Sequence, residues 1–397
     1  MKPPMPSLRQ AIAALPGSKI REVANVALEA GPGRSDVLPF WFGESDEVTP
    51  EPIRQAAAES LSRGETFYSH NLGLPELREA IAAYLAPLHG EVGADRIAVT
   101  SSGVSALMLA MQMLLAAGDE VVAVVPVWPN LTAQPAILGA RVTRVALRPK
   151  QGAWQLDIDE LKAKVTPNTR VLLVNSPNNP TGWTLTRAEQ QVLLDHCRST
   201  GTWIVADEVY ERIFFCGVFG VGPAAPSFLD IANENDRLIV AHSFSKSFLM
   251  TGWRLGWLVL PRPCMDAAGK LLEFNSSCAP VFVQRGGLAA LAMADSFVPE
   301  LLVRLQACRD RLFDGLATLP GVTVARPPAG LYVFFRVDGQ DDSLAYAKQL
   351  VAEHGLGLAP GAAFGGEGEG WLRWCFASRD PARLDLGLLR LRGALRL

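Results

Sequence analysis

The sequence has no long apolar run and no long run of like charge. Its richest apolar stretch, VVAVVPVW at residues 121–128, is short and interrupted by proline, so no segment has the length of a membrane-spanning helix. A net charge of −3 and a pI near 6.0 argue against nucleic-acid binding, which requires a basic patch. We therefore expect partners that are neither nucleic acid nor membrane.

Cysteine is scarce and scattered. The six cysteines form neither a CxxC pair nor a zinc-binding spacing. Because the N-terminal stretch has prolines where a secretory signal would have its apolar core, we expect a cytoplasmic protein with reduced thiols that fill the core. The cysteines are Cys197, Cys216, Cys264, Cys278, Cys308 and Cys375.

What the chain does have is length and an α/β pattern. Its 397 residues, 49% of them hydrophobic, suffice for a large core and two domains. Between residues 97 and 245, uninterrupted apolar strands alternate with helices, which is typical of a mostly parallel sheet covered on both faces. Helices and two strands, 331–337 and 371–377, follow and predict a smaller α+β domain.

The predicted domain boundaries follow these changes of pattern. We assign residues 47–285 to the large domain and 286–397 to the small C-terminal domain, with 1–46 as an N-terminal segment that joins the small one. Thr49 is expected to cap a helix whose start carries proline. Residues 283–319 are expected to be helical throughout.

Polar residues collect where the predicted parallel strands end. Ligands of such sheets bind beyond the carboxyl ends of the strands. The sequence therefore predicts a site there, and its first candidates are Ser102, Trp128, Asn179, Asp207 and Lys246.

The stretch Ala241–Trp257, AHSFSKSFLMTGWRLGW, holds Lys246 among uncharged neighbours. A lysine held there loses solvation, its pKa falls, and the neutral amine can form a Schiff base with an aldehyde. Ser243, Ser245 and Arg254 suit a phosphate monoester. An aldehyde that carries a phosphate describes pyridoxal 5′-phosphate (PLP), although a lysine that caps a strand end would give the same local pattern.

PLP chemistry needs further groups, and the sequence offers a candidate for each. A buried carboxylate must face the ring nitrogen, and Asp207 ends an apolar strand. Tyr210 and Asn179 could reach the phenolic oxygen. A substrate carboxylate needs a guanidinium, and Arg373 lies within the apolar strand WLRWCFA.

Two more candidates concern the ring face and the phosphate. Trp128 stands at a strand end, where an aromatic side chain could cover the ring. Ser102, Gly103 and Val104 lie at a helix start, whose backbone N–H groups can bind a phosphate.

Seven motifs in order then resemble the class I/II aminotransferases, the fold type I PLP enzymes related to aspartate aminotransferase. The resemblance extends from about residue 41 to 376. The motifs are NPTG at Asn179–Gly182, the Asp207–Tyr210 pair, Ser243–Lys246 with Arg254, Arg373, YSHNLGLPELRE, FGESDEVTP and PGAAFG.

The resemblance implies an α/β enzyme that transfers the amino group of an L-amino acid to a 2-oxo acid through a Lys246 Schiff base. It implies that Asp207 holds the pyridinium proton and that Gly43, Trp128, Asn179 and Arg373 contact substrate. It also implies a homodimer in which Tyr68 reaches the partner's cofactor. The implied cofactor-binding set is Ser102, Gly103, Val104, Trp128, Asn179, Asp207, Tyr210, Ser243, Ser245, Lys246, Arg254 and the partner-directed Tyr68.

Several features depart from the aspartate branch. Leu131 stands where that branch has a histidine that supports the aspartate, and no arginine for a second substrate carboxylate is recognisable. His70 is interpreted as a loop histidine and His242 as a hydrogen-bonded core histidine. Two alternatives stay open: a lyase or synthase of the same fold, such as a C–S β-lyase or a cyclopropane-forming synthase, and a non-enzymatic PLP-binding regulator.

Overall fold

The computed structural model describes residues 9–29, 36–215 and 223–397, and its main feature is a seven-stranded sheet. The strand order is β2-β10-β9-β8-β7-β3-β4; β10 runs antiparallel to both neighbours and the remaining pairs are parallel. The predicted mostly parallel sheet is thereby confirmed. Its strands are β2 (Ile97–Thr100), β3 (Glu120–Val125), β4 (Arg141–Ala146), β7 (Thr169–Asn175), β8 (Trp203–Asp207), β9 (Leu238–Ser243) and β10 (Gly256–Val259).

Alternate residues of these strands pack into two separate cores, which is why their sequences are apolar without interruption. In β3, Val122 and Val124 face one core, whereas Val121, Ala123 and Val125 face the other. Such two-sided burial requires helices on both faces. The helices around this sheet are α3 (Glu51–Ser62), α4 (Pro75–His89), α5 (Gly103–Leu114), α6 (Asn130–Ile137), α7 (Ile158–Lys164), α8 (Arg187–Thr200), α9 (Met265–Asn275) and α10 (Val281–Ala292).

A second, four-stranded antiparallel sheet has the order β11-β12-β15-β14. Two segments far apart in sequence also meet, because β1 (Leu38–Pro39) pairs in parallel with β13 (Leu356–Gly357). The further elements are α1 (Gln10–Ala13), α2 (Lys19–Glu29), the hairpin β5 (Arg148–Lys150) and β6 (Ala153–Gln155), α11 (Ala294–Ala317), β11 (Val322–Val324), β12 (Tyr332–Val337), α12 (Ser343–His354), β14 (Ala359–Pro360), β15 (Trp371–Cys375) and α13 (Ala382–Ala394).

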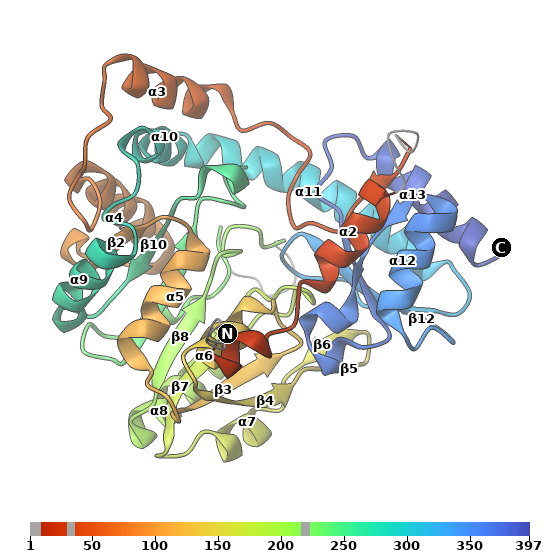
Figure 1. The fold of residues 1–397 in the computed structure, drawn as a ribbon, viewed down its shortest axis with the longest axis horizontal. Helices are drawn as coiled ribbons and strands as arrows, with labels where there is room; N and C mark the ends of the chain where they lie inside the picture. Colours follow the sequence, from red (N-terminus) through yellow and green to blue (C-terminus); the bar gives the residue numbers. More distant parts are fainter. Residues whose placement is uncertain (1–8, 30–35, 216–222) are drawn as a thin grey trace, which may run out of the picture.

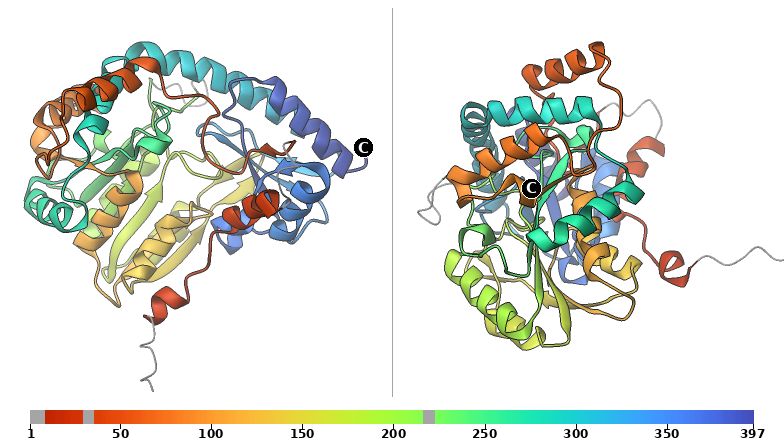
Figure 2. Two further views of the ribbon diagram at one scale, coloured as in Figure 1. Left: turned by 45° about the horizontal axis from the view of Figure 1, so that its top comes forward. Right: turned by 90° about the vertical axis from the view of Figure 1, so that its left-hand side faces the viewer.

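The long helix α11 bridges the two sheets (Figure 1). It runs from the side of α10 and α3 to the small sheet, where it packs against α13. The N-terminal helix α2, drawn in red, lies against α12 (Figure 2). The N-terminal segment therefore packs with the C-terminal part of the chain.

Two local predictions are wrong. Thr49 does not cap α3: its hydroxyl donates to the Leu249 carbonyl (2.6 Å) and accepts from Trp253 Nε1 (3.0 Å), while Pro50 occupies the cap position. The helical stretch 283–319 is divided, because Met293 ends α10 and α11 begins directly after it.

The cysteines and the lengths of the helices bear on two further predictions. Five of the cysteines are free, and Cys216 lies outside the described residues. None of the helices within the described ranges is long and apolar enough to cross a membrane.

Gly256 joins the large sheet to the start of α5 by close backbone contact. A Cβ there would lie 2.7 Å from Gly103 N and 2.8 Å from His242 O, and backbone atoms cannot move aside as a side chain can. We expect Gly256→Ala to lower the free energy of unfolding by about 1–3 kcal/mol through overpacking. The control is Gly393→Ala, since that glycine in α13 has no atom within 4 Å of its Cβ position. Urea unfolding checks both, and equal stability of the two variants would contradict the packing argument.

Candidate functional site

A pocket of about 260 Å³ lies at the carboxyl ends of the parallel strands, beside the small sheet. Twelve of the predicted site residues line it, together with seven others. The predicted ones are Gly43, Gly103, Val104, Trp128, Asn179, Asp207, Tyr210, Ser243, Ser245, Lys246, Arg254 and Arg373; the others are Ile20, Phe42, Leu107, Asn175, Val209, Thr251 and Tyr332.

Lys246 projects into this pocket from the segment after β9. Its Nζ donates a hydrogen bond to the Gly43 carbonyl (2.5 Å) and lies 5.9 Å from the Tyr210 ring centre. Burial lowers the pKa of Lys246 to about 8, and the neighbouring Arg373 and Arg254 charges act in the same direction. Roughly a tenth to a fifth of this amine is therefore neutral near physiological pH, far more than for a lysine in water, and this neutral form is available as a nucleophile.

Asp207 occupies the last position of β8, where the strand enters the pocket. Its Oδ1 accepts from Val209 N (3.3 Å), and its backbone carbonyl accepts from Asn175 Nδ2 (3.0 Å). Burial raises the pKa of Asp207 to about 7, while Lys246 opposes that rise. A carboxyl group held in this way favours a cationic ligand atom, which would restore its charge.

Arg373 enters from β15 of the small sheet and is almost fully buried. Its Nη1 donates to Asn179 Oδ1 (2.9 Å) and its Nη2 to the Trp41 carbonyl (2.5 Å), which fixes the plane of the guanidinium. The Tyr332 ring lies 4.2 Å from its Cζ. Nε has no hydrogen-bond partner, so part of this fork is free for an anion.

Tyr210 meets a residue that the sequence analysis missed. Its hydroxyl and that of Tyr332 lie 2.6 Å apart, both buried. Tyr332 also explains why residue 43 is a glycine, because a Cβ at that residue would lie 1.9 Å from the Tyr332 hydroxyl. The signal in the sequence was a polar-tipped aromatic residue at the start of a strand, which alone does not distinguish site from core.

The start of α5 forms the far end of the pocket with Ser243, Ser245 and Arg254. Gly103 is close-packed there, since a Cβ on it would lie 3.0 Å from Ser243 Cβ. Ser243 Oγ lies 2.9 Å from Ser245 Oγ. A helix N-terminus, two hydroxyls and one guanidinium suit an anion with several oxygens.

Two predicted residues do not line the pocket of their own chain. Ser102 caps α5, and its side chain accepts from Ser105 N (3.1 Å). Tyr68 is 88% exposed beside the exposed Phe67. His70 also lies outside the pocket, and its Nδ1 accepts from Leu72 N (3.2 Å).

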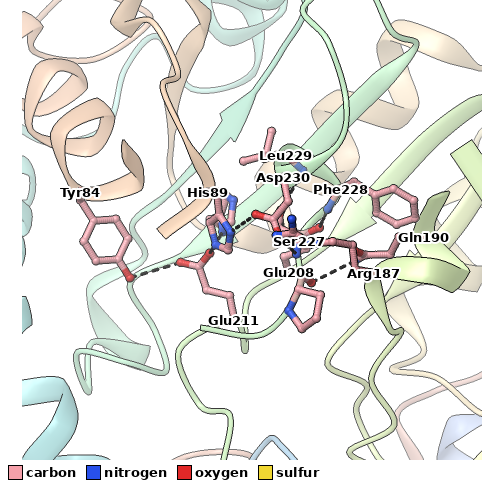
Figure 3. A network of polar contacts seen from close by, with 12 residues as sticks. Tyr84, His89, Arg187, Gln190, Glu208, Glu211, Ser227, Phe228, Leu229 and Asp230 are labelled. Atoms are coloured by element: carbon pink, nitrogen blue, oxygen red, sulfur yellow. Dashed lines mark hydrogen bonds and ion pairs between the residues drawn. The ribbon is translucent and has the colours of Figure 1, made fainter. Parts of the chain in front are cut away.

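A buried network holds Glu208 and Glu211 of the segment 207–212, and neither residue lines the pocket (Figure 3). His89, at the end of α4, lies between two carboxylates: its Nε2 is 2.9 Å from Glu211 Oε2 and its Nδ1 is 2.8 Å from Asp230 Oδ1. Glu208 accepts from Ser227 Oγ (2.5 Å). The residues beside Asp207 and Tyr210 are thus tied to two other parts of the fold.

His242 reaches the same network but differs from its predicted role. It is buried and stacked on Trp257 (5.0 Å between ring centres), yet neither ring nitrogen has a hydrogen-bond partner. Its Nδ1 lies 3.4 Å from Glu211 Oε2, and burial lowers the pKa of His242. Glu208, Glu211 and His242 have the proximity of metal ligands, but both carboxylates already accept hydrogen bonds from this chain.

Comparison with known proteins gives one consistent family. Residues 36–391 match the family described as aminotransferase class I and II. An aspartate aminotransferase from Pyrococcus horikoshii is 32% identical over 372 residues, which cover 93% of this chain and 92% of that protein. An arginine–pyruvate transaminase from Pseudomonas aeruginosa is 34% identical over 345 residues, 85% of each. Both extend over nearly the full length of the chain.

Solved structures agree with these sequence matches. An aminotransferase from Mycobacterium tuberculosis superposes with a TM-score of 0.90 at 29% identity, covering 99% of this chain and 100% of that one. The predicted fold, a large α/β part with a smaller α+β part, is therefore confirmed.

The His89 ion pairs give a pH-dependent stability. Burial opposes its charge, but hydrogen bonds to Asp230 and Glu211 raise the pKa of His89 to about 10 from 6.5. A raised folded-state pKa contributes stability that is complete below pH 6.5 and is lost as the pH rises through 10. We expect His89→Gln to cost about 3–5 kcal/mol at pH 6, because two buried carboxylates lose their partner, and much less above pH 10.

Urea unfolding at pH 6 and pH 10.5 measures this difference. His196→Gln is the matched control, since His196 Nε2 contacts only the Val165 carbonyl (2.8 Å) and an amide can replace it. A cost of His89→Gln that is the same at both pH values would show that charge is not what His89 contributes.

Proposed function

The chain belongs to the aminotransferase class I and II family and is an aminotransferase, a transferase of nitrogenous groups; from this premise we propose that it is a PLP enzyme whose Lys246 holds the cofactor. The family generally uses PLP. The observation that carries the proposal is the pocket in which the half-buried Lys246 amine, the Asp207 carboxyl and the partly free Arg373 fork converge.

The residues fit the cofactor at each of its polar ends. The carboxyl of Asp207, whose pKa burial raises to about 7, matches a ring nitrogen that must stay protonated. The hydroxyl-lined start of α5 with Arg254 matches the phosphate. Tyr210, Asn179 and Trp128 line the same pocket, which supports Tyr210 and Asn179 as partners of the phenolic oxygen and Trp128 as the side chain that covers the ring.

When bound, PLP carries the amino group between substrates and serves as the electron sink. This chain supplies orientation and proton transfer. Arg373, held in plane by Asn179 and Trp41, would bind the substrate α-carboxylate and fix the Cα–H bond toward Lys246. Lys246, with a pKa near 8, can then remove and return the proton at Cα.

For the substrate side chain, we propose an apolar amino acid. The cations among the described lining residues are Lys246, Arg254 and Arg373, and each already has a role in the proposal. A second substrate carboxylate would have no partner in the described part of one subunit, and burying it would be costly. Ile20 and Phe42 offer apolar contact in the same pocket.

We also propose the homodimer, with Tyr68 reaching the partner's phosphate. Its 88% exposure beside the 84% exposed Phe67 leaves a large aromatic surface uncovered in one subunit. The cytoplasmic location and the division into residues 47–285 and 286–397, with 1–46 joining the latter, stay predictions.

The donor proposal is tested by steady-state kinetics on the PLP-loaded enzyme. We expect kcat/KM for leucine, methionine or phenylalanine to exceed that for aspartate and glutamate by about tenfold or more, a difference of ~1.4 kcal/mol in transition-state stabilisation. Lys246→Ala is the inactive control, and Arg373→Gln is expected to raise KM for every donor. A preference for aspartate would contradict the apolar assignment. Release of 2-oxo acid and ammonia without conversion of the cofactor would favour the lyase alternative.

The Tyr68 proposal is tested with hybrid dimers prepared by co-expression under two affinity tags. A Tyr68→Ala subunit paired with a Lys246→Ala subunit contains one site with both residues intact, so we expect close to half of wild-type activity. A hybrid of Asp207→Ala and Lys246→Ala subunits is the control and should stay inactive, because both residues serve the same subunit's site. No recovery in the first hybrid would place Tyr68 in its own subunit's site, and full activity of the Tyr68→Ala homodimer would place it in neither.

A further inference from the structure

A second cavity, of about 690 Å³, lies between α3, α4, α10 and the start of α11 and shares no lining residue with the first. It is independent of the proposed cofactor chemistry. Its walls are mainly small or aliphatic: Ala56, Ala80, Ala83, Pro87, Leu88, Leu288, Ala289, Leu291, Ala292 and Ala294. Its charged lining residues are Glu59, Arg63, Arg212, Arg285 and Asp295.

Arg212 is the unusual member of this set. It is only 3% exposed, its Nε has no hydrogen-bond partner, and within the described ranges no carboxylate oxygen lies within 4 Å of its guanidinium. Its Cζ lies 5.4 Å from the centre of the Tyr84 ring. A buried arginine without a direct anionic partner is rare, because desolvating the charge is costly.

The other two arginines of the cavity are already paired. Arg63 Nε lies 3.3 Å from Glu65, and Arg285 lies 3.1 Å from Glu65 and 3.5 Å from Glu76. Arg212 is thus the cation of this cavity whose partner is missing among the described residues.

Glu211, the neighbour of Arg212 in sequence, does not supply that partner. It attracts the Arg212 charge, but its Oε1 accepts from the Tyr84 hydroxyl (3.2 Å) and its Oε2 faces His89 (2.9 Å). Both oxygens are therefore turned to the network of Figure 3. The Arg212 guanidinium also hydrogen-bonds the Tyr84 hydroxyl, and the part of it that borders the cavity has no carboxylate partner among the described residues.

We propose that this cavity binds a small monocarboxylate with an apolar body, whose carboxylate pairs with Arg212. A planar guanidinium matches a carboxylate with two parallel hydrogen bonds. The alanine and leucine walls suit an aliphatic or aromatic body. Glu59 and Asp295 on the same lining disfavour a dianion, so a carboxylate fits better than a phosphate.

The probe is hexanoate, which has no amino group and cannot react as a donor. Calorimetric titration uses the PLP-loaded Arg373→Gln enzyme, in which the carboxylate fork of the first pocket is absent. We expect one binding event per subunit, and we expect Arg212→Gln in that background to weaken it at least about tenfold, as for loss of a charge-assisted pair. Arg63→Gln is the matched control, expected to change affinity by less than about threefold because Arg63 is paired with Glu65.

Two further ligands define the chemical class. Hexanol lacks the charge and inorganic phosphate lacks the apolar body, and both should bind at least about tenfold more weakly than hexanoate. Equal binding of hexanol, or tighter binding of phosphate, would overturn the proposed class. Unchanged hexanoate affinity in Arg212→Gln would overturn the site itself.

Folding and assembly are controlled separately. Arg212→Lys keeps the charge without the fork, so it should fold like the parent and bind hexanoate with intermediate affinity. Mass measurement in solution accompanies each titration. A change of oligomeric state in Arg212→Gln, with no hexanoate binding by the parent, would assign the cavity to a contact between subunits and overturn the ligand proposal.

Discussion

The burial of one amine among other charges governs the site. Lys246 is half-buried in a pocket that also contains Asp207 and Arg373, and no ion pair joins it to a carboxylate among the described residues. Desolvation therefore shifts the pKa of both groups. It favours the neutral amine of Lys246 and the neutral carboxyl of Asp207. A ligand that brings an electrophilic carbon to one and a basic nitrogen to the other relieves both costs together.

The segment 207–212 distributes its side chains over three environments. Asp207 and Tyr210 line the first pocket, and Glu208 and Glu211 enter the buried network. Arg212 lines the second cavity. Because the segment is a tight turn after β8, successive residues point in different directions, and a short sequence serves three purposes. The network fixes Glu208 and Glu211 on either side of Val209 and Tyr210, while Leu131 supplies no polar contact to Asp207.

The sequence was sufficient for the sheet and for most of the residues that line the first pocket. Uninterrupted apolar strands predicted two-sided burial, and polar residues at strand ends predicted that Asp207 and Lys246 lie together, as they do in this pocket. Tyr332, Asn175 and the His89 network were not, because each acts through a contact distant in sequence that no local pattern records. Thr49 shows the same limit, since a tertiary hydrogen bond to Leu249 overrides its local capping preference.

Arg373 stands on the small sheet, whereas Lys246 and Asp207 belong to segments of the large one. In the proposed reaction, a substrate whose carboxylate binds Arg373 on the small sheet and whose Cα faces Lys246 on the large one would span the joint between the two parts of the protein. The gap between guanidinium and amine therefore depends on how the small sheet is placed against the large one, and α11 joins the two parts through its contacts with α10 and with β11 and β12. Substitutions along α11, whose Leu305 lines a small cavity together with Lys246, would tune which molecules fit across the gap.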